Sequence, residues 1–260
     1  MENSIIFIPV GIISGLLAGL MGIGGGNVLV PVLVILGLEA KQAAATSIIA
    51  IVITSISGSI QNYRMGYLDT RKVLGLGLPS LLTAQIGVQL ANYLPSYLLL
   101  FSFGIFLLIN ILLGALRRRL AQREPHPITF INPILARIGT GGVAGILAGL
   151  FGIGGGVIMV PLQMLWLGEP IKTAIQTSLG VIVITAISAG IGHTISGNVL
   201  FIPGILLGLG GLFGVQVSTR FLPKLPDQTV NFVFYCLLSL LSLSVFWQAW
   251  NIYQSQLISP

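Results

Sequence analysis

Eight long apolar runs constrain this chain more than any other feature of its sequence. Six of them are about 20 residues long, which is the length a helix needs to cross the roughly 30 Å hydrocarbon core of a bilayer. The pattern therefore predicts an all-α, polytopic membrane protein. The runs form two sets of four: Ile5–Leu36, Ala43–Ile60, Val73–Ala91 and Tyr97–Leu116, then Ile134–Leu167, Ala174–Ile195, Leu200–Phe221 and Val230–Trp250.

The scarcity of charge supports a membrane setting. Charged residues make up 7% of the 260 residues, against about 25% in a soluble domain, which excludes an ordinary soluble enzyme and a disordered chain. The net charge of +6 does not indicate a nucleic-acid partner, because the cations lie between apolar runs, as in membrane loops. The expected surroundings are the lipid bilayer.

The sequence offers little for catalysis or for holding a cofactor. Cys236 is the single cysteine, which excludes a disulfide framework and a cysteine-based metal site, and we expect it to be a buried apolar residue. Paired carboxylates, metal-ligand clusters and a nucleotide-binding motif are absent from the sequence. We therefore expect no enzyme activity, no metal and no cofactor.

An internal duplication organises the runs. Residues 11–31 (GIISGLLAGLMGIGGGNVLVP) and 141–161 (GGVAGILAGLFGIGGGVIMVP) share 13 of 21 positions at an offset of 130. We predict an N-terminal repeat over residues 1–120, a cytoplasmic linker over 121–133 and a C-terminal repeat over 134–260. After one inserted residue the match continues with Lys41 and Lys172, Thr46-Ser47 and Thr177-Ser178, Gly66 and Gly197, and Gly87-Val88-Gln89 and Gly214-Val215-Gln216.

The first run of each half is too long for one crossing, and three glycines interrupt it, Gly24–Gly26 or Gly154–Gly156. Glycine disfavours a helix by about 1 kcal/mol per residue. Each broken run either crosses once or returns to its own side as a hairpin. Single crossings divide the cations 8 to 4 between the two sides, whereas hairpins divide them 11 to 1. Because cytoplasmic loops carry the excess of Lys and Arg, we favour hairpins.

The hairpins have consequences for topology. Each half then holds a glycine-broken hairpin and three transmembrane helices, and this odd number of crossings makes the two halves inverted repeats, a recurring transporter architecture. Both termini are expected outside the cell and the linker in the cytoplasm. Trp247, Trp250 and Tyr253 would form an aromatic anchor near the outer end of the last helix.

The glycine breaks are the first candidate site. Gly24, Gly25 and Gly26, and likewise Gly154, Gly155 and Gly156, precede an apolar stretch long enough for a half-helix. A helix N-terminus has unpaired N–H groups and a positive dipole end, and glycine lets a ligand approach closely. The breaks thus predict an anion site without a cationic side chain. The alternative is a tight bend that needs small residues for packing.

Polar residues inside the apolar runs are the second candidate group. We expect them to act as neutral donors to a substrate, although hydroxyl groups in membrane helices also bond their own backbone. His193, whose counterpart in the first half is Asn62, is a possible proton relay. The candidate donors are Asn27, Thr46, Ser47, Gln89, Thr177, Ser178 and Gln216.

The doubled glycine motif, the A-x-x-T-S that follows it at Ala43–Ser47 and Ala174–Ser178, and the eight apolar runs resemble the TauE/SafE family of membrane permeases, also called the sulfite exporter family. The resemblance covers nearly the whole chain. It implies transport of a small anion, such as sulfite, sulfoacetate or a related sulfonate, across the bacterial inner membrane. The alternatives are a passive anion channel and, with less support, an integral membrane enzyme.

Overall fold

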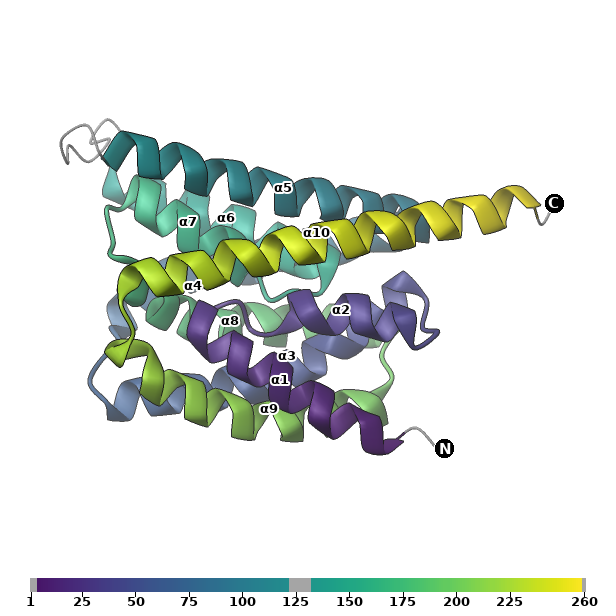
Figure 1. Cartoon of the computed structure of the whole chain (residues 1–260), viewed down its shortest axis with the longest axis horizontal. Coiled ribbons are helices and arrows are strands. Elements are labelled where there is room, and N and C mark those ends of the chain that lie inside the picture. The colour runs from purple at the N-terminus through teal and green to yellow at the C-terminus, as the bar shows by residue number, and fades with distance from the viewer. Residues whose placement is uncertain (1–3, 122–131, 259–260) are drawn as a thin grey trace.

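The computed structural model describes residues 4–121 and 132–258, and both segments are built from helices (Figure 1). No strand occurs in these residues, which confirms the all-α prediction. Most of the predicted linker, including Pro125–Pro127, lies outside the described residues. The helices are α1 (Ser4–Met21), α2 (Gly26–Ile35), α3 (Ala40–Arg64), α4 (Thr70–Tyr93) and α5 (Ser96–Ala121), then α6 (Pro133–Phe151), α7 (Gly156–Trp166), α8 (Ile171–Ile195), α9 (Phe201–Phe221), the 3₁₀ turn η1 (Leu222–Lys224) and α10 (Asp227–Ile258).

Six helices in the described part of the chain are long and apolar enough to cross a membrane, namely α3, α4, α6, α8, α9 with η1, and α10. This confirms the multi-pass prediction. α6 joins the expected helices because it extends over 19 residues to the glycine break. The helix α5 spans 26 residues, and Ser96–Leu112 form its described apolar part.

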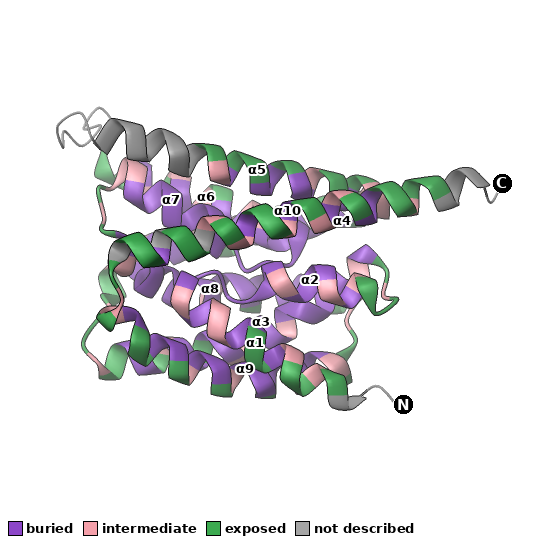
Figure 2. Ribbon diagram, viewed as in Figure 1, coloured by how far each residue is buried: buried purple, intermediate pink, exposed green. Residues whose placement is uncertain are grey.

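The inner and outer helices differ clearly in burial. In the most apolar stretch of α3, 67% of the residues are buried, and in that of α8, 78%. The corresponding share in α10 is 25% (Figure 2). The two helices α5 and α10 pack on each other and form an outer layer over one face of the bundle (Figure 1). Cys236 lies on α10 and is exposed. The prediction of a buried Cys236 is therefore wrong, because α10 turns only one side toward the bundle.

The two halves interlock through their helix pairs. The most extensive pairs are α1 with α9 and α4 with α6, so the first helix of each half packs against the fourth helix of the other. Their backbones approach very closely. A Cβ atom added to Gly11 would lie 2.2 Å from the carbonyl oxygen of Leu207, and one added to Gly141 would lie 2.1 Å from that of Leu76. This packing needs glycine at both positions.

The chain reverses direction between α1 and α2 and between α6 and α7. Figure 1 shows α1 and α2 running in opposite senses, and the Ser14 hydroxyl donates to the carbonyl oxygen of Gly25 at 3.0 Å. In the second half, a Cβ atom on Gly155 would lie 2.5 Å from the carbonyl oxygen of Ala144. The two helices of each hairpin differ in length: α1 and α2 have 18 and 10 residues, and α6 and α7 have 19 and 11.

Candidate functional site

The glycine segments are residues 22–26, at the junction of α1 and α2, and residues 152–156, at the junction of α6 and α7. Each contains a backbone conformation that only glycine adopts readily. Gly22, Gly24 and Gly25 have φ of 66°, 70° and 83°, and the repeat-related Gly152, Gly154 and Gly155 have φ of 68°, 72° and 79°. These values lie in the left-handed region, where a Cβ atom meets the following carbonyl oxygen. Each segment is buried, and Gly25 and Gly155 directly precede the short helices α2 and α7.

The two glycine segments touch each other in the core. A Cβ atom on Gly26 would lie 2.7 Å from the carbonyl oxygen of Gly152, and one on Gly156 would lie 2.1 Å from that of Gly22. The N-terminus of each short helix therefore lies against a carbonyl oxygen of the opposite half. Gly24 and Gly154 both lie against the side chains of Ile51 and Ile182, on α3 and α8.

Two serines link the segments across the halves. The Ser47 hydroxyl lies 2.7 Å from the carbonyl oxygen of Gly152, and the Ser178 hydroxyl lies 2.7 Å from that of Gly22. Each hydroxyl also lies 2.8 Å from a carbonyl oxygen of its own helix, three residues earlier. A hydroxyl has one hydrogen to donate, so each serine can release the opposite segment and keep a partner.

The neighbouring threonines differ between the halves. Thr46 is buried, and its Oγ1 accepts from the backbone N–H of Leu200, which precedes α9, at 3.1 Å. Thr177 is equally buried, but its Oγ1 has no hydrogen-bond partner among the described residues. Both threonines therefore lie inside the bundle, but among the described residues only Thr46 has a hydrogen-bond partner for its hydroxyl.

The two predicted glutamines do not occupy equivalent places. Gln216 on α9 is half-buried and donates to the carbonyl and hydroxyl oxygens of Ser57 at 3.2 and 2.8 Å. Gln89 on α4 is exposed. Its expected place is taken by Gln85, which donates to the carbonyl and hydroxyl oxygens of Ser188 at 2.6 and 3.0 Å.

A one-turn shift explains the missed glutamine. Ser57 and Ser188 are 131 residues apart, and so are Gln85 and Gln216, whereas the Gly87-Val88-Gln89 match uses an offset of 127. Four residues are about one helical turn, so that match pairs the wrong turn of α4 with α9. The offset of Thr46 and Thr177, also 131, is the signal that identifies Gln85.

Three further polar residues are buried with unpaired atoms. Asn27, the second residue of α2, has 0% of its surface exposed, and neither atom of its amide has a partner in the described structure. His193 is buried, with Nε2 2.8 Å from the carbonyl oxygen of Gly149, and its Nδ1 has no partner in the described part of the chain. Asn62, its counterpart, is also buried, and neither of its amide atoms has a partner within residues 4–121 and 132–258.

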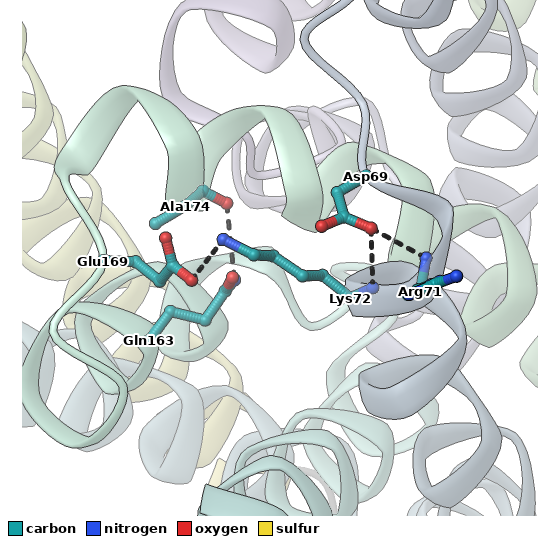
Figure 3. Close-up of polar contacts among 6 residues, drawn as sticks. All are labelled: Asp69, Arg71, Lys72, Gln163, Glu169 and Ala174. Atoms are coloured by element: carbon teal, nitrogen blue, oxygen red, sulfur yellow. Dashed lines mark hydrogen bonds and ion pairs between the residues drawn. The ribbon is translucent and has the colours of Figure 1, made fainter.

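An ion pair joins the halves at one end of α4 (Figure 3). The Lys72 ammonium donates to Glu169 Oε1 at 2.5 Å, and the two side chains are 29% and 16% exposed. Asp69 fixes the start of α4 by accepting from the backbone N–H groups of Arg71 and Lys72. No sequence pattern indicates this pair, since its partners are 97 residues apart.

Metal ligands do not gather in the described segments. No group of three or more His, Cys, Asp or Glu side chains in residues 4–121 and 132–258 could hold a metal ion. Apart from the His193 imidazole, the buried polar groups that the structure describes near the glycine segments are backbone amides, hydroxyls and carboxamides, which are uncharged. Such groups can bind an anion through hydrogen bonds and the helix dipole.

Comparison with known proteins finds membrane transporters among the relatives of this chain. The chain is 27% identical to the probable membrane transporter protein YunE of Bacillus subtilis, over 94% of this chain and 97% of that protein. It is 31% identical to the probable membrane transporter protein MJ0441 of Methanocaldococcus jannaschii, over 72% of this chain and 71% of that protein. No solved structure matches the chain.

A family model described as sulfite exporter TauE/SafE matches residues 7–245, which is nearly the whole chain and includes both glycine segments. The relatives are named as membrane transporters and not as enzymes. The chain therefore belongs to the TauE/SafE family of multi-pass membrane transporters.

Proposed function

We propose that this chain is a permease that moves a small anion, a sulfur oxyanion such as sulfite or a short organosulfonate, across the bacterial inner membrane. One observation carries the proposal: two short helices begin at glycine segments that meet in the core. Their N-termini bring unpaired N–H groups and two positive dipole ends to one place. The family description as a sulfite exporter supports the substrate class.

Neutral donors reach this place from the opposite half: Ser47 and Ser178 contact the glycine segments directly. Each helix terminus contributes about 0.3–2 kcal/mol toward an anion, and no buried carboxylate among the described residues opposes it. A site without a fixed Arg or Lys holds an anion loosely enough to release it. The proposed site consists of Gly24, Gly25, Gly26, Asn27, Thr46, Ser47, Gly154, Gly155, Gly156, Thr177, Ser178 and Gln216. The exposed Gln89 is replaced in it by Gln85.

The proposed topology is an inverted repeat with both termini on the outside. In Figure 1, α1 begins and α10 ends on one side, while α5 ends and α6 begins on the other. The equivalent helices α3 and α8 run in opposite senses in that view, and the helix pairs exchange partners between the halves. This arrangement supports the hairpin interpretation, in which 11 of the 12 cations face the cytoplasm.

Contact between the glycine segments favours a carrier over a passive channel. The carbonyl oxygens of Gly22 and Gly152 lie where an anion would meet the two helix ends, so the segments must separate for the substrate to bind. Ser47 and Ser178 make separation inexpensive, because each keeps a carbonyl of its own helix as an acceptor. An open channel would not need this movement.

His193 is the proposed coupling residue. It is buried on α8, and its Nε2 contacts the carbonyl oxygen of Gly149, three residues before the second glycine segment. An imidazole in this position can carry a proton with the substrate. Proton coupling predicts that an imposed pH gradient drives uptake, and that His193→Asn, which copies Asn62 of the first half, removes this response.

The test is transport by purified protein in proteoliposomes. Uptake of sulfite, sulfate, methanesulfonate and chloride is measured beside a neutral and a cationic solute, with and without a pH gradient. Saturable transport of sulfite or the sulfonate supports the proposal. Conductance that does not saturate indicates a channel. Transport of the cation or the neutral solute, with no response to any oxyanion, contradicts the proposal.

A further inference from the structure

The starts of α2 and α7 carry different polar groups, although the duplication relates them. Asn27 is the second residue of α2, and Val157 holds that position in α7. The Ser14 hydroxyl donates to the carbonyl oxygen of Gly25, and Ala144 stands at the equivalent position against Gly155. Both polar additions therefore lie at the same helix end, that of α2.

Asn27 is the more informative of the two. Its side chain is completely buried, and neither Nδ2 nor Oδ1 has a hydrogen-bond partner among the described residues. Buried polar atoms in proteins are nearly always hydrogen-bonded, so an orphaned amide calls for an explanation. A ligand that is present only during the transport cycle provides one.

Helix geometry directs this amide toward the proposed site. The Cα–Cβ bonds of a helix tilt toward its N-terminus, so the Asn27 side chain leans toward the first turn of α2. The backbone N–H groups of Gly26 and Asn27 have no acceptor within the helix, whereas that of Val28 donates to the carbonyl oxygen of Gly25 at 3.1 Å. The N-cap residue of α2 is Gly25, which has no side chain to cap the helix. The unpaired amide and the unpaired N–H groups therefore share one helix end.

We infer that the transported anion binds between the two helix ends, with Asn27 at the N-terminus of α2 as its specificity-determining contact, and that the start of α7, where Val157 holds the equivalent position, contributes backbone N–H groups and no side-chain donor. This inference rests on the proposed function. Asn27 Nδ2 donates to one oxygen of the anion while the backbone N–H groups bind another. An oxyanion offers several oxygens to such a divided set of donors, and chloride does not, so Asn27 selects sulfite over chloride.

Equilibrium binding to the purified full-length protein tests the inference. Sulfite and chloride are titrated against the parent protein and against Asn27→Val, which copies the residue that α7 tolerates at this position. The matched control is Asn110→Val on α5, which removes another fully buried carboxamide with an unpaired Oδ1. Asn27→Ser keeps a small donor and serves if the valine variant does not fold.

Loss of a hydrogen bond to a charged ligand predicts that Asn27→Val weakens sulfite binding by roughly 10- to 100-fold, with little change in chloride binding. Asn110→Val is expected to bind sulfite as the parent does, and Asn27→Ser to fall between. Parent-like sulfite binding by Asn27→Val or Asn27→Ser overturns the inference and leaves the proposed function standing. A parent protein that neither binds nor transports any oxyanion overturns the proposed function itself.

Discussion

Ser47 in the first half donates to the carbonyl oxygen of Gly152 in the second half, at 2.7 Å. The duplication repeats this contact in reverse, from Ser178 to Gly22 at the same distance. The two halves therefore hold each other's glycine segments through one hydroxyl each. This reciprocal arrangement ties the helix breaks to the inner helices α3 and α8.

Removing these hydroxyls tests their role in holding the segments together. Ser47→Ala and Ser178→Ala are each expected to lower the stability of the protein by about 1 kcal/mol, the usual net value of a buried hydrogen bond. The measurement is the Tm in detergent. The control is Ser102→Ala on α5, where the half-buried hydroxyl bonds only the carbonyl of Leu99 in its own helix. An equal loss in all three variants would show that the contact between the halves is not special.

The two threonines are predicted to behave differently on substitution by valine. Thr177→Val removes a buried hydroxyl that has no partner among the described residues, so it should leave the Tm unchanged or higher while it slows oxyanion uptake. Thr46→Val should lower both, because it also leaves the N–H of Leu200 without its acceptor. Uptake and Tm are measured on the same preparations. A Thr177→Val protein with parental uptake would remove this residue from the site.

Topology is tested by cysteine labelling in a Cys236→Ser background, which is needed because Cys236 is exposed. Single cysteines at Ser4 and Ser259 should react with an impermeant thiol reagent added outside intact cells, and one at Gln122 should not. The reason is the 11-to-1 distribution of cations. Labelling of Gln122→Cys from outside, or of neither terminal cysteine, contradicts the inverted hairpin topology.

The Lys72–Glu169 pair is predicted to stabilise the contact between the halves modestly. Both side chains are partly exposed, so Glu169→Gln should cost on the order of 1 kcal/mol or less. The loss should shrink at high salt, and the double variant Lys72→Glu with Glu169→Lys should recover part of it. The measurement is the Tm at low and high ionic strength. A decrease in Tm that does not depend on salt, with no recovery in the double variant, would show that the attraction between the two charges does not stabilise this contact.

Much of the fold could be predicted from the sequence, because run length and repetition are local properties. The apolar runs located the membrane-spanning helices, and the glycine triplets located the two breaks. Contacts between residues far apart in the sequence were harder to predict. The ion pair of Lys72 with Glu169 and the contact of Ser47 with Gly152 join residues about 100 positions apart, and no periodicity within one run reports on them.

The candidate site shows where sequence comparison between the halves was insufficient. The match of Gln89 to Gln216 followed residue identity, but four residues shift a helix by about one turn, and the structure uses Gln85 instead. Cys236 was expected to be buried because its run is apolar. An apolar residue on an outer membrane helix faces lipid as readily as protein, so hydropathy alone cannot decide between the two.

Sulfite uptake by glycine variants tests the central claim most directly, namely that the glycine-started helices form the transport site. Gly155→Ala places a Cβ atom at φ 79°, 2.5 Å from the carbonyl oxygen of Ala144, whereas the control Gly168→Ala has a similar φ of 64° but nothing within 4 Å. Both variants carry backbone strain of about 1–2 kcal/mol. Gly155→Ala is expected to insert in the membrane and lose nearly all sulfite uptake in proteoliposomes, while Gly168→Ala keeps it. Parental uptake by Gly155→Ala and by Gly25→Ala would show that the breaks are only bends, and would contradict the account.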